Sequence, residues 1–309
     1  MKNILITGGA GFIGANLALK LQEEYPSAKL TIIDDFRSAS FKNLQGYRGD
    51  FIAADLATLD LSRYFRANTL DAIFHLASIT DTTNHNQFQQ VHDNVESFRN
   101  LLHFVASKSN KTRIMFASSA ATYGIASGVN TLDQPLHPAN VYAFSKVQLE
   151  NLARLFLRSY PSRHIVGLRY FNVYGPREAH KGTAASMIYQ LAQQIKAGQN
   201  PRIFKFGEQR RDFVYIKDIV ELTIRAITTA RKSGIYNAGS GTARSFNDVV
   251  TILNRTFGTD LETEYFDNPY PFYQPHTEAD MSVTIKALRY KPQYTLEKGI
   301  LDYFQSGHL

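Results

Sequence analysis

The sequence contains no cysteine, which excludes disulfide bonds, thiolate metal sites and a cysteine nucleophile together. The absence fits a reducing compartment, and we predict no metal site. No apolar run reaches the roughly 18 residues that a membrane-spanning helix requires. Met1 leads straight into a strand-like segment without the features of a signal peptide. We therefore expect a cytoplasmic protein without a membrane partner.

Long basic runs are also absent, although the chain of 309 residues carries a formal charge of +7. A positive charge favours anionic partners, either nucleotide phosphates or a nucleic acid, but dispersed basic residues also serve solubility. We expect nucleotide phosphates and no nucleic acid. With no linker, repeat or low-complexity tract, the 44% hydrophobic composition predicts one large or two modest globular domains.

The first motif is a glycine-rich turn between a strand and a helix, at residues 4–14. An apolar strand runs into Gly8, Gly11 and Gly14, and an apolar stripe with helical spacing follows. The glycines permit a tight turn, a close approach of backbone to pyrophosphate, and close packing of helix on strand. Free amides at the helix N-terminus favour negative charge there. An ordinary glycine turn is the alternative, but this order of elements favours a dinucleotide site, which also includes Phe12 and Ile13.

A second strand, at residues 30–33, ends at an acidic pair followed by an arginine. An acidic residue at this distance from the glycines accepts hydrogen bonds from the adenosine ribose, and we assign Asp34 to that role. Arg37 can instead pair with a 2′-phosphate, so the choice between NAD and NADP as cofactor stays open. The alternative is that Arg37 is a plain surface arginine. Asp55, at the end of a third strand, can meet the adenine amino group or cap a helix expected at 56–65. The remaining predicted cofactor contacts are Asp35, Leu56, Ala77 and Asn94.

A fourth buried strand, at residues 71–77, is followed by a run rich in hydroxyl groups. Ligands of open α/β sheets bind beyond the carboxyl ends of the strands. Ser78 and Thr80 are therefore candidate substrate contacts, although a solvated loop fits the same residues equally well. His75 lies among apolar neighbours and is interpreted as a core histidine rather than a catalyst.

Strands and helices alternate from residue 3 to about 170, which predicts an α/β fold with a doubly wound parallel sheet. The fifth strand ends at Ser119, on the edge where cofactor and substrate would meet, although an isolated serine there is more often a strand-end cap. Tyr142 and Lys146 stand one turn apart near the start of a later helix. An ammonium one turn away favours the phenolate, so Tyr142 can act as an acid or base on a sugar hydroxyl. The spacing alone is a weak signal, because it also occurs on solvated helix faces.

With the glycine turn, Asp34, Ser119 and this pair in order, the chain resembles the extended short-chain dehydrogenase/reductase family, whose members act mostly on nucleotide sugars. The resemblance covers essentially the whole length. It implies an N-terminal Rossmann-type domain, a smaller C-terminal domain that binds the nucleotide sugar, and Ser119, Tyr142 and Lys146 as catalytic residues. It also implies that Lys146 holds the nicotinamide ribose of tightly bound NADP or NAD, one per subunit of a homo-oligomer.

Within that family, the segment 164–186 is similar to the central signature of ADP-L-glycero-D-manno-heptose 6-epimerases. Related 4-epimerases share its Arg-Tyr-Phe-Asn sequence, whereas the later run from Pro176 to Ser186 is more discriminating. The segments 209–215 and 273–280 resemble the same group. The resemblance implies interconversion of ADP-D-glycero-D-manno-heptose and ADP-L-glycero-D-manno-heptose by transient oxidation at carbon 6, for lipopolysaccharide core or another surface glycan.

Further site residues lie in this second half of the chain. Asn172 can bind the diphosphate or sugar, and Arg211 offers a planar fork for phosphates unless it only pairs with Asp212 at the surface. Lys181 lies in a loop with little apolar company, where a cation can bind phosphate or carry a proton. In the resembled epimerases this lysine is the second acid/base opposite the tyrosine. Other predicted substrate contacts are Ser186, Phe204 (on the adenine or in the core) and, by resemblance only, Tyr273.

The two domains are expected to interleave, with NAD(P) bound by 1–170 and about 212–239, and the nucleotide sugar by 171–211 and 240–309. Three rival functions stay open. A UDP-sugar 4-epimerase or related reductase shares the catalytic residues but gives no reason for the Lys181 loop. A 4,6-dehydratase normally carries an Asp-Glu pair where this chain has Ala120 and Ala121. A non-catalytic dinucleotide sensor or RNA-binding protein fits the positive charge, yet neither the tyrosine nor the lysine is lost.

Overall fold

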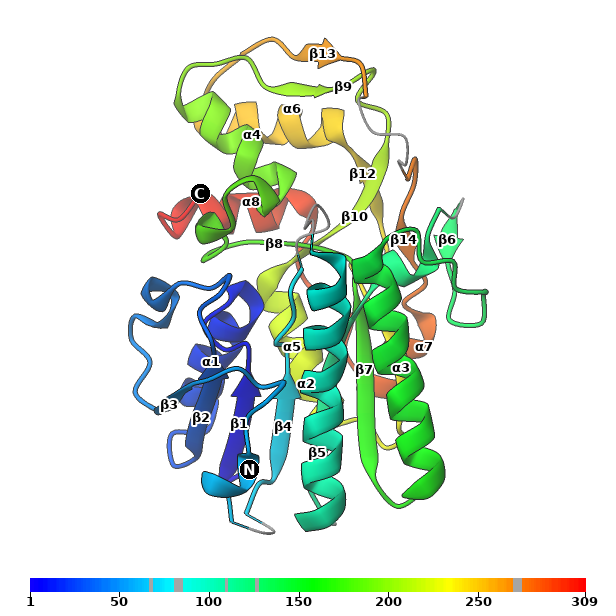
Figure 1. Cartoon of the computed structure of the whole chain (residues 1–309). Helices are drawn as coiled ribbons and strands as arrows, with labels where there is room; N and C mark the ends of the chain where they lie inside the picture. The colour runs from blue at the N-terminus through cyan, green and yellow to red at the C-terminus, as the bar shows by residue number, and fades with distance from the viewer. Residues whose placement is uncertain (67–68, 81–85, 109–110, 126–127, 269–273) are drawn as a thin grey trace.

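A seven-stranded parallel sheet forms the centre of the molecule (Figure 1). The computed structural model describes residues 1–66, 69–80, 86–108, 111–125, 128–268 and 274–309. Every neighbouring pair of strands in this sheet runs parallel. Across the sheet, the strands are β11 (Gly234–Ala238), β7 (His164–Tyr170), β5 (Arg113–Ser119), β4 (Ala72–His75), β1 (Asn3–Thr7), β2 (Lys29–Asp34) and β3 (Asp50–Ala53).

Helices cover both faces of this sheet. One face carries α1 (Phe12–Glu24) and α5 (Ile216–Thr228), and the other carries α2 (Gln87–Lys108) and α3 (Val141–Ser159) (Figure 1). Within β1, Ile4 and Ile6 join the apolar core on the first face, whereas Leu5 joins the core on the second. Successive side chains of a strand point to opposite faces, so this uninterrupted apolar run is buried on both. The predicted doubly wound α/β fold is confirmed.

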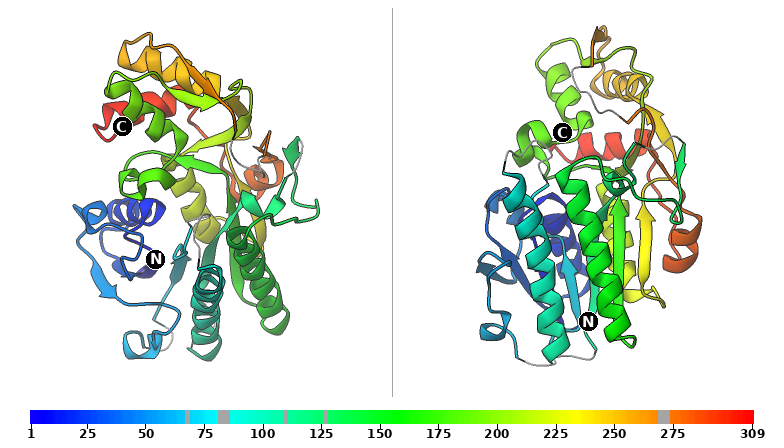
Figure 2. Two further views of the ribbon diagram at one scale, coloured as in Figure 1. Left: turned by 45° about the horizontal axis from the view of Figure 1, so that its top comes forward. Right: turned by 45° about the vertical axis from the view of Figure 1, so that its right-hand side comes forward.

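A smaller unit of short strands and helices lies beyond the carboxyl ends of the large sheet, as the views in Figure 2 show. Its helices pack α4 on α6 and α6 on α8, with their apolar stripes in the shared core. The helices are α4 (Met187–Lys196), α6 (Phe246–Phe257) and α8 (Leu296–Gln305). One sheet has β8 (Asn172–Tyr174), β10 (Arg210–Tyr215) and β12 (Ala243–Ser245), and a second has β9 (Arg202–Phe204) and β13 (Glu264–Phe266).

A buried carboxylate organises the junction of β10 with two loops. Asp212 is 0% exposed and accepts hydrogen bonds from the backbone amides of Ser240, Gly241 and Ala279 at 2.6, 3.0 and 3.0 Å. A buried charge with this many donors is well compensated and ties the segments together. The alternative in which Asp212 pairs with Arg211 at the surface is therefore wrong.

The chain crosses between the two units more than once. After β10 it returns through α5 to β11, which pairs with β7 at the edge of the large sheet. The helix α7 (Ser282–Leu288) packs near β11, and β6 (Val129–Asn130) pairs with β14 (Glu278–Ala279). The division of the chain into two interleaved domains remains a proposal.

One expected helix differs from the structure. Residues 56–65 form turns and a short 3₁₀ helix, η2 (Leu61–Arg63), because the Asp60 carboxylate accepts hydrogen bonds from the Ser62 amide and hydroxyl at 3.0 and 2.6 Å and begins a new turn. The segment that carries Lys181 forms the 3₁₀ helix η4 (Ala179–Ala184) before α4 begins at Met187. The other short helices are η1 (Phe41–Leu44) and η3 (Ala120–Tyr123).

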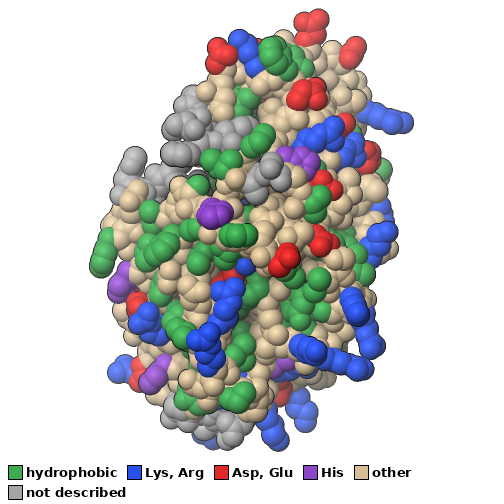
Figure 3. All heavy atoms as spheres, turned by 90° about the vertical axis from the view of Figure 1, so that its right-hand side faces the viewer, with side chains coloured by type: hydrophobic (Ala, Val, Ile, Leu, Met, Phe, Trp, Pro, Cys, Tyr) green, Lys and Arg blue, Asp and Glu red, His purple; other side chains and the backbone are tan. Residues whose placement is uncertain are grey.

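One face of the molecule carries its charge in a dispersed form. On the face shown in Figure 3, lysine and arginine side chains lie among acidic, polar and apolar ones rather than in one patch. Within the described ranges, no helix is both long and apolar enough to cross a membrane.

Candidate active site

One cavity of about 870 Å³ contains nearly the whole predicted site. It is lined by residues at the carboxyl ends of the central strands and by residues of the smaller unit. Every predicted site residue lines this cavity except Tyr273, which lies outside the described residues. The segments that sequence reasoning assigned to cofactor and to substrate therefore meet in one space.

The glycine turn between β1 and α1 forms one wall. Gly8 has a φ of +68°, which favours glycine, and a Cβ added at Gly14 would lie 2.1 Å from the Gly8 carbonyl oxygen. The helix starts at Phe12 after the N-cap Gly11, and among the described residues no side chain caps it. The first-turn amides can therefore receive an anion, so this turn fits the pyrophosphate of a dinucleotide.

Asp34 closes this turn from the end of β2. Its carboxylate accepts hydrogen bonds from the amides of Ala10 and Phe36, both at 2.9 Å. Burial raises the pKa of Asp34, and these two hydrogen bonds oppose the rise. Each carboxylate oxygen keeps a second lone pair, which leaves Asp34 able to accept a ribose hydroxyl.

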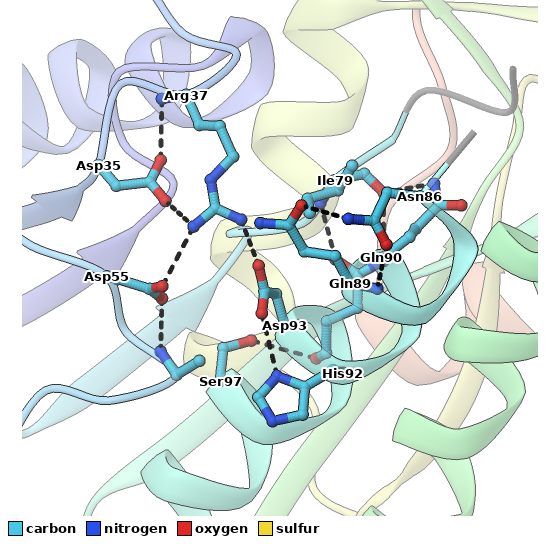
Figure 4. A network of polar contacts seen from close by, with 12 residues as sticks. Asp35, Arg37, Asp55, Ile79, Asn86, Gln89, Gln90, His92, Asp93 and Ser97 are labelled. Carbon is cyan, nitrogen blue, oxygen red and sulfur yellow. Dashed lines mark hydrogen bonds and ion pairs between the residues drawn. The ribbon is translucent and has the colours of Figure 1, made fainter. Parts of the chain in front are cut away.

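Arg37 lies beyond Asp34 in a cluster of carboxylates, shown in Figure 4. Its guanidinium contacts Asp35, Asp55 and Asp93. The first two were predicted as cofactor contacts, whereas nothing in the sequence pattern of α2 singled out Asp93. Asp55 also accepts a hydrogen bond from the Ala57 amide at 2.9 Å, so it caps a local turn without starting a helix.

The loop after β4 is held by α2. The Asn94 side chain accepts a hydrogen bond from the Ile79 amide at 2.7 Å and donates to the Ile79 carbonyl and the Ser145 hydroxyl at 3.1 and 3.0 Å. Asn94 thus joins this loop to α3 while lining the cavity. Ser78 has a buried hydroxyl oxygen without a hydrogen-bond partner in the described part of the chain, whereas Thr80 is exposed at the cavity edge. Both remain available to a ligand.

Tyr142 and Lys146 lie on the first turns of α3, whose N-cap Asn140 accepts a hydrogen bond from the Ala143 amide at 2.8 Å. The Lys146 ammonium donates to the Ala117 carbonyl at 3.0 Å and lies 5.6 Å from the centroid of the Tyr142 ring. Burial lowers the pKa of Lys146 to about 7. Burial also raises the pKa of Tyr142, opposed by a hydrogen bond with Ser119. Burial is the larger of these effects, so the net shift of the Tyr142 pKa is upward and not toward the phenolate that the lysine was expected to favour.

Ser119 is a cap at the end of β5, and its contact with a substrate stays a prediction. Its hydroxyl accepts a hydrogen bond from the Ala121 amide at 3.1 Å and so caps η3 at the end of β5. The same hydroxyl faces Tyr142, whose pKa it lowers against the larger effect of burial. A group that lies between the strand end and the phenol can also contact a substrate oxygen there.

A second cation reaches the cavity from the smaller unit. Lys181 lies on η4, and its ammonium is 5.7 Å from the centroid of the Phe12 ring on α1. Burial lowers the pKa of Lys181, and the nearby Glu178 carboxylate opposes that effect. Glu178 is 0% exposed and accepts hydrogen bonds from the amides of Gly175 and Ser186 at 3.0 and 2.6 Å. This carboxylate fixes both ends of the loop that carries Lys181.

Asn43 joins the Lys181 loop to the glycine turn. Its side-chain amide nitrogen donates to the Ala10 carbonyl at 3.0 Å and lies 3.0 Å from Nδ1 of His180, while its backbone carbonyl accepts from the Arg177 guanidinium at 3.1 Å. Arg177 has a φ of +76°, an uncommon conformation for a side chain of this size. Sequence reasoning missed Asn43, because it lies in no local motif and its partners are distant in the chain. It also missed the role of Glu178, although this residue stands in the discriminating run from Pro176 to Ser186 and its partners Gly175 and Ser186 are near in sequence.

The far end of the cavity is aromatic and basic. Phe204 packs edge-on against Phe266, with ring centroids 4.9 Å apart, and the Arg211 guanidinium lies 5.9 Å from the Phe246 ring centroid. The Asn172 side-chain amide donates long hydrogen bonds to the Asp212 carbonyl at 3.4 Å and to the Thr277 hydroxyl at 3.3 Å. Ser186 caps α4 through the Tyr189 amide at 3.2 Å. This end can stack a planar base and attract phosphates.

A buried ion pair supports the site from behind. Glu150, one turn after Lys146, accepts hydrogen bonds from the Arg169 guanidinium at 2.8 and 2.7 Å and from the Ser118 hydroxyl at 2.7 Å. Glu150 is 0% and Arg169 2% exposed. The network joins α3, β5 and β7 directly beneath Ser119 and Lys146, so it fixes their relative positions.

The fold and this site define a nicotinamide-dependent class of sugar-nucleotide enzyme. The chain belongs to the NAD dependent epimerase/dehydratase family, whose profile matches residues 4–239.

Individual members of this family that resemble the chain include ADP-heptose epimerases and a UDP-sugar epimerase. The chain is 36% identical to the ADP-L-glycero-D-manno-heptose-6-epimerase of Brachyspira hyodysenteriae, covering 97% of this chain and 96% of that protein. The crystal structure of the Helicobacter pylori ADP-L-glycero-D-manno-heptose-6-epimerase is 44% identical with a TM-score of 0.90, covering 99% of this chain and 96% of that one. The UDP-glucuronic acid 4-epimerase of Bacillus cereus, solved with UDP-glucuronic acid and NAD, is 28% identical with a TM-score of 0.85, covering 98% and 99%.

Proposed function

We propose that this chain interconverts ADP-D-glycero-D-manno-heptose and ADP-L-glycero-D-manno-heptose by epimerisation at carbon 6. The proposal rests on one observation: Tyr142, from the unit of the large sheet, and Lys181, from the smaller unit, line the same cavity as the glycine turn. Relatives that cover nearly the whole chain bear the name of this reaction. The product would serve lipopolysaccharide core or another surface glycan.

The reaction needs a redox step, because carbon 6 is an unactivated sugar carbon. A nicotinamide cofactor, when bound, accepts and returns a hydride. Removal of that hydride is coupled to loss of the hydroxyl proton, which Tyr142 or Lys181 can accept, and leaves a ketone on the substrate. Carbon 6 lies outside the ring, so rotation presents the opposite face of the ketone. The second of the two groups then protonates the oxygen as the opposite configuration forms.

The proposed cofactor is NADP or NAD, tightly bound with one per chain. The first-turn amides of α1 would receive the pyrophosphate, Asp34 the adenosine ribose, and Lys146 the nicotinamide ribose. Lys146 is suited to this role because its ammonium already donates to a carbonyl oxygen in the cavity. The neighbouring residues proposed to complete the cofactor site are Gly8, Gly11, Phe12, Ile13, Gly14, Asp35, Arg37, Asp55, Leu56, Ala77 and Asn94.

The nucleotide sugar would occupy the rest of the cavity. The aromatic and basic end, with Phe204 and Arg211, suits the base and phosphates, and Ser119 and Lys181 lie toward the reacting carbon. Ser78, Thr80, Asn172 and Ser186 complete the proposed contacts, with Tyr273. The division into 1–170 with about 212–239, and 171–211 with 240–309, a cytoplasmic location and a homo-oligomer belong to the same proposal.

Proton NMR of the purified protein with ADP-D-glycero-D-manno-heptose tests the function. The carbon 6 epimer should form, with UDP-galactose unchanged in a parallel sample. Tyr142→Phe and Lys181→Met should each lower kcat by about 10²–10⁴-fold, whereas Lys291→Met, at an exposed lysine, should not. Turnover of UDP-galactose without turnover of the heptose would instead assign a 4-epimerase.

A further inference from the structure

Four carboxylates and one guanidinium surround the point where the adenosine ribose is proposed to bind. Asp34 is the last residue of β2 and Asp35 follows it, Asp55 follows β3, and Asp93 comes from the second turn of α2. All four line the cavity together with Arg37. Figure 4 shows Asp35, Asp55 and Asp93 around the Arg37 guanidinium. Their formal charges sum to about −3 when the carboxylates are ionised.

Both terminal nitrogens of the Arg37 guanidinium contact carboxylates of this cluster. One terminal nitrogen lies 2.9 Å from Asp35 and 3.1 Å from Asp55, and the other contacts Asp93. The carboxylates are in turn held in place, because Asp35 accepts from the Arg37 amide at 2.9 Å and Asp93 lies 3.0 Å from Nδ1 of His92. Turning Arg37 toward another anion would leave three carboxylates without their shared cation.

We propose that this cluster makes the protein select NAD over NADP. The inference rests on the proposed function, since it assumes that the adenosine ribose binds at Asp34. A 2′-hydroxyl can donate to that carboxylate, whereas a 2′-phosphate brings up to two negative charges into an anionic site. Arg37, which sequence reasoning offered as a phosphate receptor, is already neutralised by Asp35, Asp55 and Asp93.

Net charge rather than the strength of single ion pairs carries this selectivity. The Arg37 side chain is 34% exposed, so each of its ion pairs is individually weak. An incoming phosphate could displace one carboxylate, but the other charges would remain within a few ångströms. The other cations that line the cavity lie elsewhere: Lys146 on α3, Lys181 on η4, Arg202 on β9 and Arg211 on β10.

The test measures dinucleotide binding without any sugar. Cofactor released from the purified protein by acid is identified by mass spectrometry, and the stripped protein is titrated with NADH and NADPH by fluorescence. NADH should bind at least tenfold more tightly, and this ratio should shrink between 0.05 and 0.5 M salt because screening weakens charge repulsion. Selection by shape alone would leave the ratio unchanged by salt.

Charge-removing variants identify the residues responsible. Asp35→Asn and, separately, Asp93→Asn should each raise the affinity for NADPH relative to that for NADH about three- to tenfold. Asp50→Asn is the matched control, because it removes an exposed charge paired with Lys29 at the opposite end of β3. NADPH binding as tight as NADH binding in the wild type would overturn the selectivity alone, as would equal effects of Asp35→Asn and Asp50→Asn. Failure to bind either dinucleotide would overturn the proposed function as well.

Discussion

Lys146 should destabilise the cofactor-free protein while being required for its activity. Its side chain is 2% exposed, and burial lowers its pKa to about 7. In the unfolded chain a lysine titrates near 10.4. The unfolded state therefore binds more protons than the folded state between about pH 7 and pH 10, so the free energy of unfolding rises with pH across that window.

The size of this effect follows from the two pKa values. A depression of roughly 3.4 units amounts to about 4 kcal/mol of unfavourable free energy at pH 7, and about 2 kcal/mol of it should be relieved by pH 9. Replacing the lysine by methionine removes the term and keeps a similar volume. It also loses the hydrogen bond to the Ala117 carbonyl, worth about 1 kcal/mol.

Urea unfolding of the stripped wild type and Lys146→Met at pH 7 and pH 9 measures the difference. The variant should be more stable at pH 7 by about 2–3 kcal/mol, and the gap should narrow by about 2 kcal/mol at pH 9, with epimerase activity lost. Lys291→Met, at an exposed lysine, controls for the loss of one positive charge. A gap that does not change with pH, or a less stable variant at pH 7, would refute the reasoning.

Three further substitutions test the support of the site. Gly14→Ala places a Cβ against the Gly8 carbonyl, so it should lower the free energy of unfolding by about 1–3 kcal/mol in a denaturation experiment. It should also weaken dinucleotide binding in a titration, and unchanged binding would count against the close turn. Asn43→Ala should lower kcat about tenfold in steady-state assays by releasing the Lys181 loop, and an unchanged kcat would contradict that link. Glu150→Gln leaves the buried Arg169 unpaired and should cost about 3–5 kcal/mol in urea unfolding, whereas a loss below about 1 kcal/mol would show the charge to be dispensable.

Local motifs explain how much of the site was predictable. The glycine turn, Asp34 and the Tyr142–Lys146 pair each depend on residues close in sequence, whose spacing dictates a turn or a helix face. Their meeting in one cavity followed from the rule that ligands bind beyond the carboxyl ends of parallel strands. The fold could be predicted for the same reason, since the alternation of apolar strands and amphipathic helices is a local pattern.

The remaining features depend on contacts between distant segments. Asp93 meets Arg37 across 56 positions, and Asn43 meets His180 across 137, so no window of sequence contains either pair. The upward shift of the Tyr142 pKa was not predictable from the spacing of the pair, because spacing says nothing of how deeply a side chain is buried. The helix expected at 56–65 does not form, because the Asp60 side chain accepts a hydrogen bond from a nearby backbone amide and begins a separate turn.

The central claim is epimerisation at carbon 6 through hydride transfer within one active site. The most direct test is NMR of the reaction with ADP-D-glycero-D-manno-heptose in D₂O without added cofactor. The account predicts that the carbon 6 epimer forms and retains its original hydrogen at that carbon, because the hydride returns without exchanging with solvent. Deuterium at carbon 6 of the product, or no epimer even with NAD and NADP added, would contradict it.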